Sequence, residues 1–192
     1  MCMDNRCRKL FIGDQGGRVY CLNIKNGARM KSFKKDSKNK DKEKEFISSL
    51  IYWGWIEKPG EEEDVQKNTL LTGSWDSIQR VFDDNDPDAS TGLLREPVDR
   101  HNGRPINFLD LRPNDSLAAS ASEDGSVILY NHTNHKMEGR LQPPDEANPP
   151  SVICCKFIAN ANCMVTSDID GYLNFYAIPP SYIKNTLLCR IR

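Results

Sequence analysis

A short pattern that occurs four times constrains this chain more than any other feature of its sequence. Each copy has an apolar segment that ends in small residues, a two-residue turn, and a second segment that ends in a bulky apolar residue. The four copies read LFIGDQGGRVYCLNI from Leu10, LLTGSWDSIQRVFDD from Leu70, LAASASEDGSVILYN from Leu117 and MVTSDIDGYLNFYAI from Met164. Internal repeats of this kind predict a modular architecture in which each copy supplies one small unit.

The centre of each copy has the residues of a tight hairpin turn. Asp-Gly and Gly-Gly pairs favour a primed two-residue turn, because both central residues adopt a positive φ in it. We therefore predict a β-hairpin in every copy. The predicted turns are Gly16-Gly17, Asp76-Ser77, Asp124-Gly125 and Asp170-Gly171.

Further strand candidates lie on both sides of the hairpins. The segments EFISSLIYWGW, PINFLDLRPNDS and SVICCKFIANAN precede the second, third and fourth copies, and RMKSF, GLLREPV, MEGRLQ and NTLLCRI follow the four hairpins. Nine residues precede Leu10, which we take as too few for a strand and its turn. Apolar residues at helical spacing are absent from the remaining segments. The sequence thus predicts an all-β fold of about four repeats, three complete and one partial.

The spacing of the turns indicates where the repeats begin and end. The turns are 60, 48 and 46 residues apart, and the first gap contains two charged stretches that we interpret as loop insertions, 34–45 and 58–67. The first of these is rich in Lys but has interleaved acidic residues and no aromatics, which favours a solvated loop over a nucleic-acid contact. The predicted domain spans 8–192, with repeats at 8–33, 45–97, 104–142 and 150–192.

Composition narrows the class of protein. A net charge of -1 points to no particular partner, and we expect no nucleic-acid partner. The N-terminus lacks an apolar signal segment, and the longest apolar run, LIYWGWI, is too short to span a bilayer. We therefore expect an intracellular, cytoplasmic chain without a membrane partner. Seven cysteines without a C-x-x-C motif make a disulfide framework a poor interpretation.

No motif predicts catalysis, a cofactor or a metal site. His132 and His135 form an H-x-x-H without a third ligand at zinc spacing. The stretch DDNDPDASTGLLRE departs from a calcium loop, because Ala89 stands where Gly is needed and Arg95 where Glu is needed. Walker and nucleophile-elbow motifs do not occur. The expected function is therefore binding, with no cofactor.

The segments TGSWDSIQRVFDD and SASEDGSVILYN resemble the WD40 signature of small residues, a turn Asp and a following apolar strand. The resemblance implies a β-propeller. Its Trp position is filled by Leu22, Phe82, Tyr130 and Tyr176, and no Gly-His pair precedes any repeat. In the family, that His joins the turn Asp, a strand Ser or Thr and the Trp in a buried polar network. The resemblance therefore implies a weakened network here, in which Asp76, Asp124 and Asp170 keep the turn position.

The run from GSWDSIQRVFDD to VTSDIDGYLNFYAIPP also resembles the C-terminal blades of long WD-repeat proteins of cilia and flagella, some of which carry EF-hands. Propellers usually close with four to eight blades. We expect the chain to be part of a larger propeller, with the missing blades on a longer chain. Pairing of two copies into an eight-bladed ring and a self-closed four-bladed propeller are the alternatives.

The resemblance implies a protein-interaction scaffold in a ciliary or cytoskeletal assembly. An RNA- or ribosome-associated scaffold is the alternative, and a propeller hydrolase is a third interpretation. Trp75 precedes the turn at a position that the family exposes on its upper rim, where an aromatic residue would anchor a partner. Packing of Trp75 against the adjacent blade is the competing interpretation. The predicted partner-binding positions are Gln15, Trp75, Glu123 and Ile169.

Overall fold

The computed structural model describes residues 1–33, 46–54, 68–85, 98–99, 101–112, 117–131, 136–143, 148–158, 162–178 and 186–192. Every helix or strand in this part of the chain is a β-strand, so the all-β expectation is confirmed. The chain divides into two compact units, Met1–Val98 and Asp99–Arg192, which are described separately. The predicted insertions at 34–45 and 58–67 and the His132 and His135 pair lie outside the described residues.

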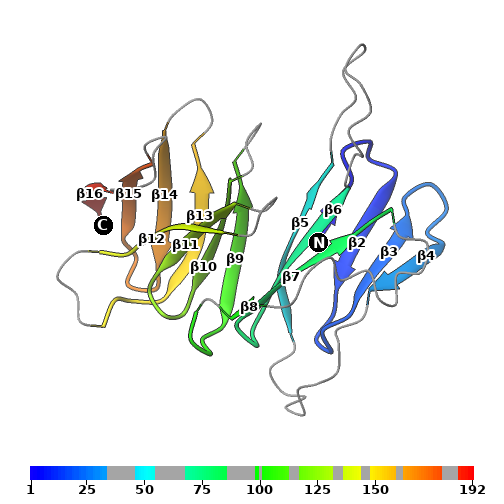
Figure 1. Cartoon of the computed structure of the whole chain (residues 1–192), viewed down its shortest axis with the longest axis horizontal. Helices are drawn as coiled ribbons and strands as arrows, with labels where there is room; N and C mark the ends of the chain where they lie inside the picture. The colour runs from blue at the N-terminus through cyan, green and yellow to red at the C-terminus, as the bar shows by residue number, and fades with distance from the viewer. Residues whose placement is uncertain are drawn as a thin grey trace. The chain divides into compact units, whose positions relative to one another are not determined.

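The strands form four antiparallel sheets of four strands, each called a blade below (Figure 1). Blade 1 contains β1 (Cys2–Met3), β2 (Lys9–Gly13), β3 (Val19–Asn23) and β4 (Arg29–Phe33), and blade 2 contains β5 (Ile47–Trp53), β6 (Thr69–Ser74), β7 (Ile78–Asp83) and β8 (Val98–Asp99). Blade 3 contains β9 (Ile106–Leu111), β10 (Leu117–Ser122), β11 (Val127–Asn131) and β12 (Met137–Leu141). Blade 4 contains β13 (Val152–Phe157), β14 (Cys163–Asp168), β15 (Leu173–Ala177) and β16 (Thr186–Ile191).

The first blade is complete, so the expectation that it lacks its opening strand was wrong. Cys2 and Met3 pair with Phe11 and Leu10. The intervening turn is short because the Asp4 carboxylate accepts hydrogen bonds from the backbone N–H groups of Arg8 at 2.6 Å and Lys9 at 2.8 Å. A two-residue strand and this side-chain-closed turn fit into the residues before β2.

The hairpin turns are where predicted, but their type differs from the prediction. A positive φ occurs only at the second residue of each pair, namely Gly17, Ser77, Gly125 and Gly171. In blade 3 the Gly125 N–H donates to the Ser122 carbonyl at 3.2 Å, and the Ser122 N–H donates to the Ser126 carbonyl at 3.1 Å. These bonds describe a three-residue loop with one left-handed residue, which requires a positive φ at a single position only.

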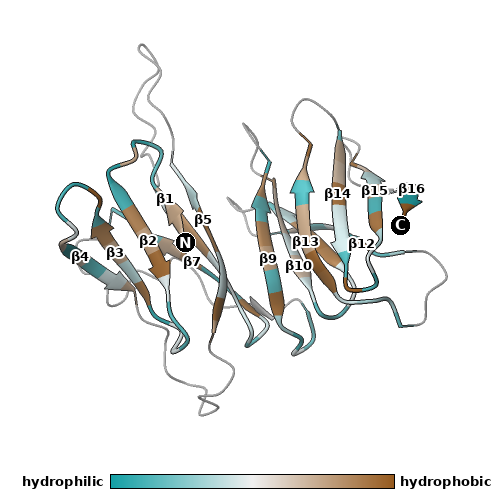
Figure 2. Ribbon diagram, turned by 180° about the vertical axis from the view of Figure 1, so that it is seen from behind, coloured by the Kyte–Doolittle hydropathy of each residue, from teal (hydrophilic) through white to brown (hydrophobic). Residues whose placement is uncertain are grey.

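Apolar residues alternate along the strands and gather where two blades of a unit pack together (Figure 2). In unit 1 the face of blade 1 formed by Phe11, Val19, Cys21 and Phe33 packs against the face of blade 2 formed by Ile47, Leu50, Leu70 and Phe82. In unit 2 the corresponding core joins blade 3 residues such as Leu129 and Leu141 to Met164 and Tyr176 of blade 4. We call the face that blade 1 turns to blade 2, and that blade 3 turns to blade 4, the forward face. The face of blade 2 or blade 4 that it meets is called the backward face.

The cysteines agree with a reduced protein. All seven are free, and Cys154, Cys155 and Cys163 lie in strands as predicted. Burial raises the pKa of the Cys155 thiol well above its usual value, with a further increase from the Asp110 carboxylate. Cys155 therefore serves as a small apolar core residue.

Candidate functional site

The four predicted partner-binding residues occupy equivalent places in the loops between the second and third strands of their blades. Gln15, Trp75, Glu123 and Ile169 all have exposed side chains, and the exposed fraction is 45% for Trp75 and 67% for Ile169. Trp75, Glu123 and Ile169 directly follow the last residue of β6, β10 and β14, and Gln15 lies two residues after the end of β2. The loops therefore present one exposed residue per blade.

The backbones of three of these residues are fixed. The N–H of Trp75 donates to the Phe46 carbonyl at 3.0 Å, that of Glu123 to the Pro105 carbonyl at 3.0 Å, and that of Ile169 to the Ser151 carbonyl at 2.9 Å. Each bond ties the loop to the residue just before the first strand of the same blade. Each exposed side chain thus extends from a loop whose backbone is hydrogen-bonded to the start of the first strand of its blade.

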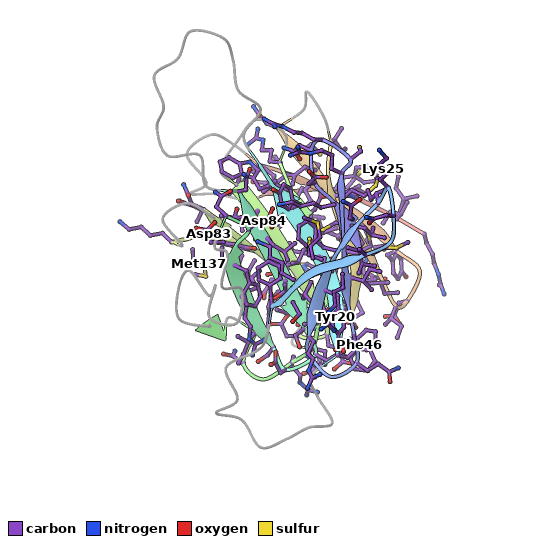
Figure 3. All side chains as sticks on the ribbon, turned by 90° about the vertical axis from the view of Figure 1, so that its right-hand side faces the viewer. Tyr20, Lys25, Phe46, Asp83, Asp84 and Met137 are labelled. Carbon is purple, nitrogen blue, oxygen red and sulfur yellow. The ribbon has the colours of Figure 1, made fainter. Side chains whose placement is uncertain are left out.

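Within unit 1, the ring of Trp75 packs on an aromatic residue of its own blade. Its ring lies 4.8 Å from the Phe46 ring, centroid to centroid, with an angle of 45° between the planes. Phe46 precedes β5 and is itself half-buried, and it lies toward one end of the strands, with Lys25 toward the other, in Figure 3. Almost half of Trp75 stays accessible, so the two rings form an exposed aromatic pair.

The loop below this pair is held by a buried ion pair. Arg80 donates to Asp76 with an Nη2–Oδ2 distance of 2.7 Å, and the two side chains are 4% and 7% exposed. The Asp76 carboxylate also accepts from the Ile78 N–H at 3.1 Å, and the Ser74 hydroxyl accepts from the Asp76 N–H at 3.3 Å. Asp76, Ser74 and Arg80 therefore fix the loop, while the Trp75 side chain stays 45% exposed beside it.

Blade 3 contains a buried histidine network that the sequence was expected to have only in weakened form. The fully buried His101 ring lies 3.0 Å from Asp124 through Nδ1 and 2.8 Å from the Ser120 hydroxyl through Nε2. Burial by itself would raise the pKa of Asp124, but hydrogen bonds from His101 and Ser126 outweigh it and lower that pKa below its usual value. The expectation failed because Arg100 replaces the Gly before His101. The separation of 23 residues between His and Asp is the signal that could have found it.

In blades 1 and 4 the loop is held by a carboxylate that lies two residues before the position of Asp76 and Asp124 in the other blades. Asp14 accepts from the N–H groups of Gly16 at 2.9 Å and Arg18 at 2.8 Å. Asp168 accepts from the N–H groups of Asp170 at 3.1 Å and Tyr172 at 2.9 Å, and from Asn174 Nδ2 at 3.2 Å. The expectation that Asp170 keeps the network position was therefore wrong, because its side chain is exposed and Asp168 takes that role.

A buried charged cluster in unit 1 was not predicted from the sequence. Asp84 follows β7 and its side chain has no exposed surface. Lys9 Nζ lies 2.6 Å from Asp84 Oδ2, Lys31 Nζ lies 2.9 Å from Asp84 Oδ1, and the Tyr52 hydroxyl donates to Asp84 Oδ2 at 2.9 Å. We call these four residues the Asp84 cluster. It connects β2 and β4 of blade 1 with β5 and the end of β7 in blade 2.

The Asp84 cluster has the chemistry of a structural ion pair. Burial raises the pKa of the Tyr52 hydroxyl above its usual value, and the neighbouring Asp84 charge raises it further. Two lysines next to one carboxylate compensate the buried negative charge. Within the described part of the chain, no group of three His, Cys, Asp or Glu side chains is arranged to hold a metal ion. The same residues include no helix that is long and apolar enough to cross a membrane.

Comparisons with known proteins agree with this architecture. Residues 94–131 match the WD40 family, described as "WD domain, G-beta repeat". Over 88 residues, 46% of the chain, the sequence is 30% identical to the small ribosomal subunit protein RACK1y of Oryza sativa subsp. japonica. The fold is similar to the crystal structure of the computationally designed Ika8 protein, with a TM-score of 0.66 and 18% identity over 96% of this chain. The chain spans 24% of the ribosomal protein and 46% of the designed protein.

Proposed function

This chain belongs to the WD40-repeat family, and from that premise we propose that it is a non-enzymatic scaffold that binds other proteins through its exposed loop residues. WD40-repeat proteins act as protein-interaction scaffolds. The single observation that carries the proposal is the exposed aromatic pair of Trp75 and Phe46 on a loop with a fixed backbone. A scaffold of this kind works by shape, because rigid sheets hold the loops in place while partners dock on them.

Trp75 is the side chain best suited to anchor a partner. Tryptophan is enriched among the residues that dominate binding energy at protein interfaces, because it removes a large apolar surface from water on docking. A side chain that is already fixed in the free protein also loses less conformational entropy on binding. The 2.7 Å ion pair below the loop and the packing on Phe46 both restrict the motion of Trp75.

The proposal is tested by comparing proteins retained by the immobilised chain and by two variants. Trp75→Ala should lose the retained partners or weaken their binding by about thirtyfold, equivalent to about 2 kcal/mol. Met30→Ala removes an exposed apolar side chain from β4, outside the four loops, and serves as the matched control. Retention of the same proteins with unchanged affinity by Trp75→Ala would exclude this anchor.

A ribosome-associated scaffold is the second candidate, and the 30% identity to a small ribosomal subunit protein over 88 residues favours it. The prediction is cosedimentation of the chain with small ribosomal subunits. Binding through the nucleic-acid backbone would weaken steeply with salt, whereas binding to ribosomal proteins would depend on salt much less. A chain that stays in the supernatant at low salt would exclude this candidate.

We also propose a cytoplasmic setting that includes ciliary or cytoskeletal assemblies. The support for this setting is the similarity of three of the repeats to the C-terminal blades of ciliary WD-repeat proteins. The prediction is that a fluorescently tagged chain concentrates along the axoneme of ciliated cells. A uniform cytoplasmic distribution in the same cells would contradict it.

A further inference from the structure

The forward face of blade 4 carries apolar side chains that no residue of the described chain covers fully. Leu173 is 43% exposed and Ile191, its partner across β15 and β16, is 52% exposed. Val165 and Phe175 on the same face are half-buried, and Cys189 is exposed. Exposed apolar side chains that share one sheet face mark a surface for another molecule.

The same positions are buried in the two blades whose forward faces are covered within a unit. Positions are equivalent here when they lie at the same distance from the hairpin turn. In blade 3 the residues equivalent to Leu173 and Ile191 are Val127 and Leu141, which are 1% and 2% exposed. In blade 1 they are Val19 and Phe33, which are 1% and 0% exposed. What covers such a face in both units is the backward face of a blade.

Blade 1 has an uncovered backward face. Met3 and Ile24 are 53% and 43% exposed, and Leu10, Ile12 and Leu22 are half-buried. The equivalent residues of blade 4 form a buried backward face, namely Met164, Thr166, Tyr176 and Ile178. Among the described residues, blade 4 thus has an uncovered forward face in unit 2, and blade 1 has an uncovered backward face in unit 1.

The position of the Asp84 cluster shows which faces fit together. In unit 1, Lys9 and Lys31 on a forward face meet Asp84 on a backward face. In unit 2 the three equivalent positions are apolar or lack a side chain: Leu117, Gly139 and the fully buried Ile178.

The two uncovered faces have the apolar combination. Cys163 and Cys189 stand on the forward face of blade 4 at the positions of Lys9 and Lys31, and Ile24 stands on the backward face of blade 1 at the position of Asp84. If either uncovered face packed against a face of the unit 1 type, the buried lysines or the aspartate of that face would have no partner of opposite charge. The two faces match each other in polarity.

We propose that the forward face of blade 4 binds the backward face of blade 1 of a second copy of this chain. The contact is head-to-tail, because two different surfaces meet, and it repeats the apolar packing between blades 3 and 4. Cys163 and Cys189 pack against Ile24 of the second copy in this arrangement. The apolar area removed from water supplies the driving force for the association.

The first test is the mass of the whole chain in solution with a reductant present, measured by light scattering over a range of concentrations. The expected result is a dimer or a larger head-to-tail assembly. Ile24→Asp and Leu173→Asp each place a carboxylate on one of the two faces and should weaken association on the order of a hundredfold. Met137→Asp, at an exposed position of β12 in blade 3 that belongs to neither face, is the matched control and should associate like the wild type. A wild-type chain that is monomeric at every concentration tested would overturn the proposal.

A charge exchange tests the pairing of the two faces. The double variant Ile24→Asp with Cys189→Lys should regain most of the association that Ile24→Asp loses, because the new Asp and Lys reproduce the contact of Asp84 with Lys31 between two copies. Each single variant should remain weakened. Equal weakening of the double variant and the single variants would overturn the proposed register.

A mixing experiment tests the head-to-tail geometry. Leu173→Asp keeps an intact backward face, and Ile24→Asp keeps an intact forward face. Equal amounts of the two weakened variants should therefore form a one-to-one complex. If Ile24→Asp alone still forms dimers and the mixture gains nothing, like faces associate with each other and the proposal fails.

Discussion

Unit 1 and unit 2 both pack the forward face of one blade on the backward face of the next, but their contacts have different chemistry at one position. In unit 1 this position holds a buried carboxylate between two lysines, at 2.6 and 2.9 Å. In unit 2 the equivalent positions are Leu117, Gly139 and Ile178. The repeat thus fixes the register of the strands, while the residues of each contact decide which blade can be its neighbour.

The hairpin loops show the same independence of geometry and chemistry. The four loops share one left-handed residue at the same place. Asp76 is held by Arg80 in unit 1, whereas Asp124 is held by His101 in unit 2. Blades 1 and 4 use Asp14 and Asp168 instead. A loop of fixed shape is therefore built from three different sets of polar side chains.

The largest effect should come from conversion of the unit 1 contact toward the unit 2 type. Asp84→Ile leaves Lys9 and Lys31 without a compensating charge and should reduce the stability of unit 1 by about 3–5 kcal/mol. The triple variant with Lys9→Leu and Lys31→Met has no charge to compensate and should be close to the wild type in stability. Denaturation followed by tryptophan fluorescence reports unit 1, because all three tryptophans lie before Val98.

Two outcomes would contradict this account of the Asp84 cluster. A stable Asp84→Ile variant would show that Lys9 and Lys31 do not need the charge of Asp84. A triple variant as unstable as the single variant would show that the loss comes from packing of the Ile side chain.

A smaller effect should follow from removal of the histidine network in unit 2. His101→Ala leaves the Asp124 carboxylate and the Ser120 hydroxyl without their ring partner and opens a cavity. The expected loss is about 2–3 kcal/mol for unit 2. Amide hydrogen exchange of β10 and β11 measures it, and the tryptophan signal of unit 1 should not change. A loss shared equally by both units would contradict a local role for His101.

The forward faces differ in how much space they leave for a methyl group. A Cβ at Gly13 would lie 2.5 Å from Ile47 Cγ2, whereas blade 3 already holds Ala121 at the equivalent position with no exposed surface. Gly13→Ala should therefore destabilise unit 1 by about 1–3 kcal/mol through overpacking. Ala121→Gly should cost unit 2 about 1 kcal/mol through lost burial and added chain entropy. A neutral Gly13→Ala would mean that Ile47 has room to shift.

The smallest predicted effect concerns acid. Hydrogen bonds from His101 and Ser126 leave the pKa of Asp124 below its usual value in spite of burial. A carboxylate whose folded-state pKa is lowered stabilises the fold above its unfolded pKa of about 3.9, and this contribution is lost as the pH falls through the folded pKa. The stability difference between the wild type and Asp124→Asn, measured by denaturant unfolding, should therefore shrink below about pH 4. A difference that is independent of pH would contradict the lowered pKa.

The sequence predicted the strands well because alternation and turn residues are local signals. The segments PINFLDL, SVICCKF, MEGRLQ and NTLLCRI all contain strands of the structure. The opening strand of blade 1 was missed because only two residues pair, and the carboxylate of Asp4 replaces a longer turn. The turn type was wrong because Asp-Gly fits both a primed turn and a three-residue loop with one left-handed residue.

The polar contacts were harder to predict because they connect residues far apart in the chain. Asp84 stands in an acidic stretch typical of a solvated loop. Its neighbours in the sequence do not indicate that it contacts Lys9, which is 75 residues away in the chain but 2.6 Å away in space. His101 was overlooked because its neighbour is Arg rather than Gly. The place of Trp75 in the hairpin loop could be read from the sequence, since its distance from the turn is a local property. Its role in binding remains a prediction.

The central claim is that exposed interaction residues sit on a fixed backbone, and amide hydrogen exchange measured by NMR tests it most directly. The N–H groups of Trp75, Glu123 and Ile169 donate to carbonyls at 2.9–3.0 Å, whereas the Gln15 N–H has no such bond among the described residues. We predict slow exchange for the first three amides and fast exchange for Gln15. A Trp75 amide that exchanges as fast as that of Gln15 would contradict the claim, because the loop would then be mobile and its aromatic pair not held in place for a partner.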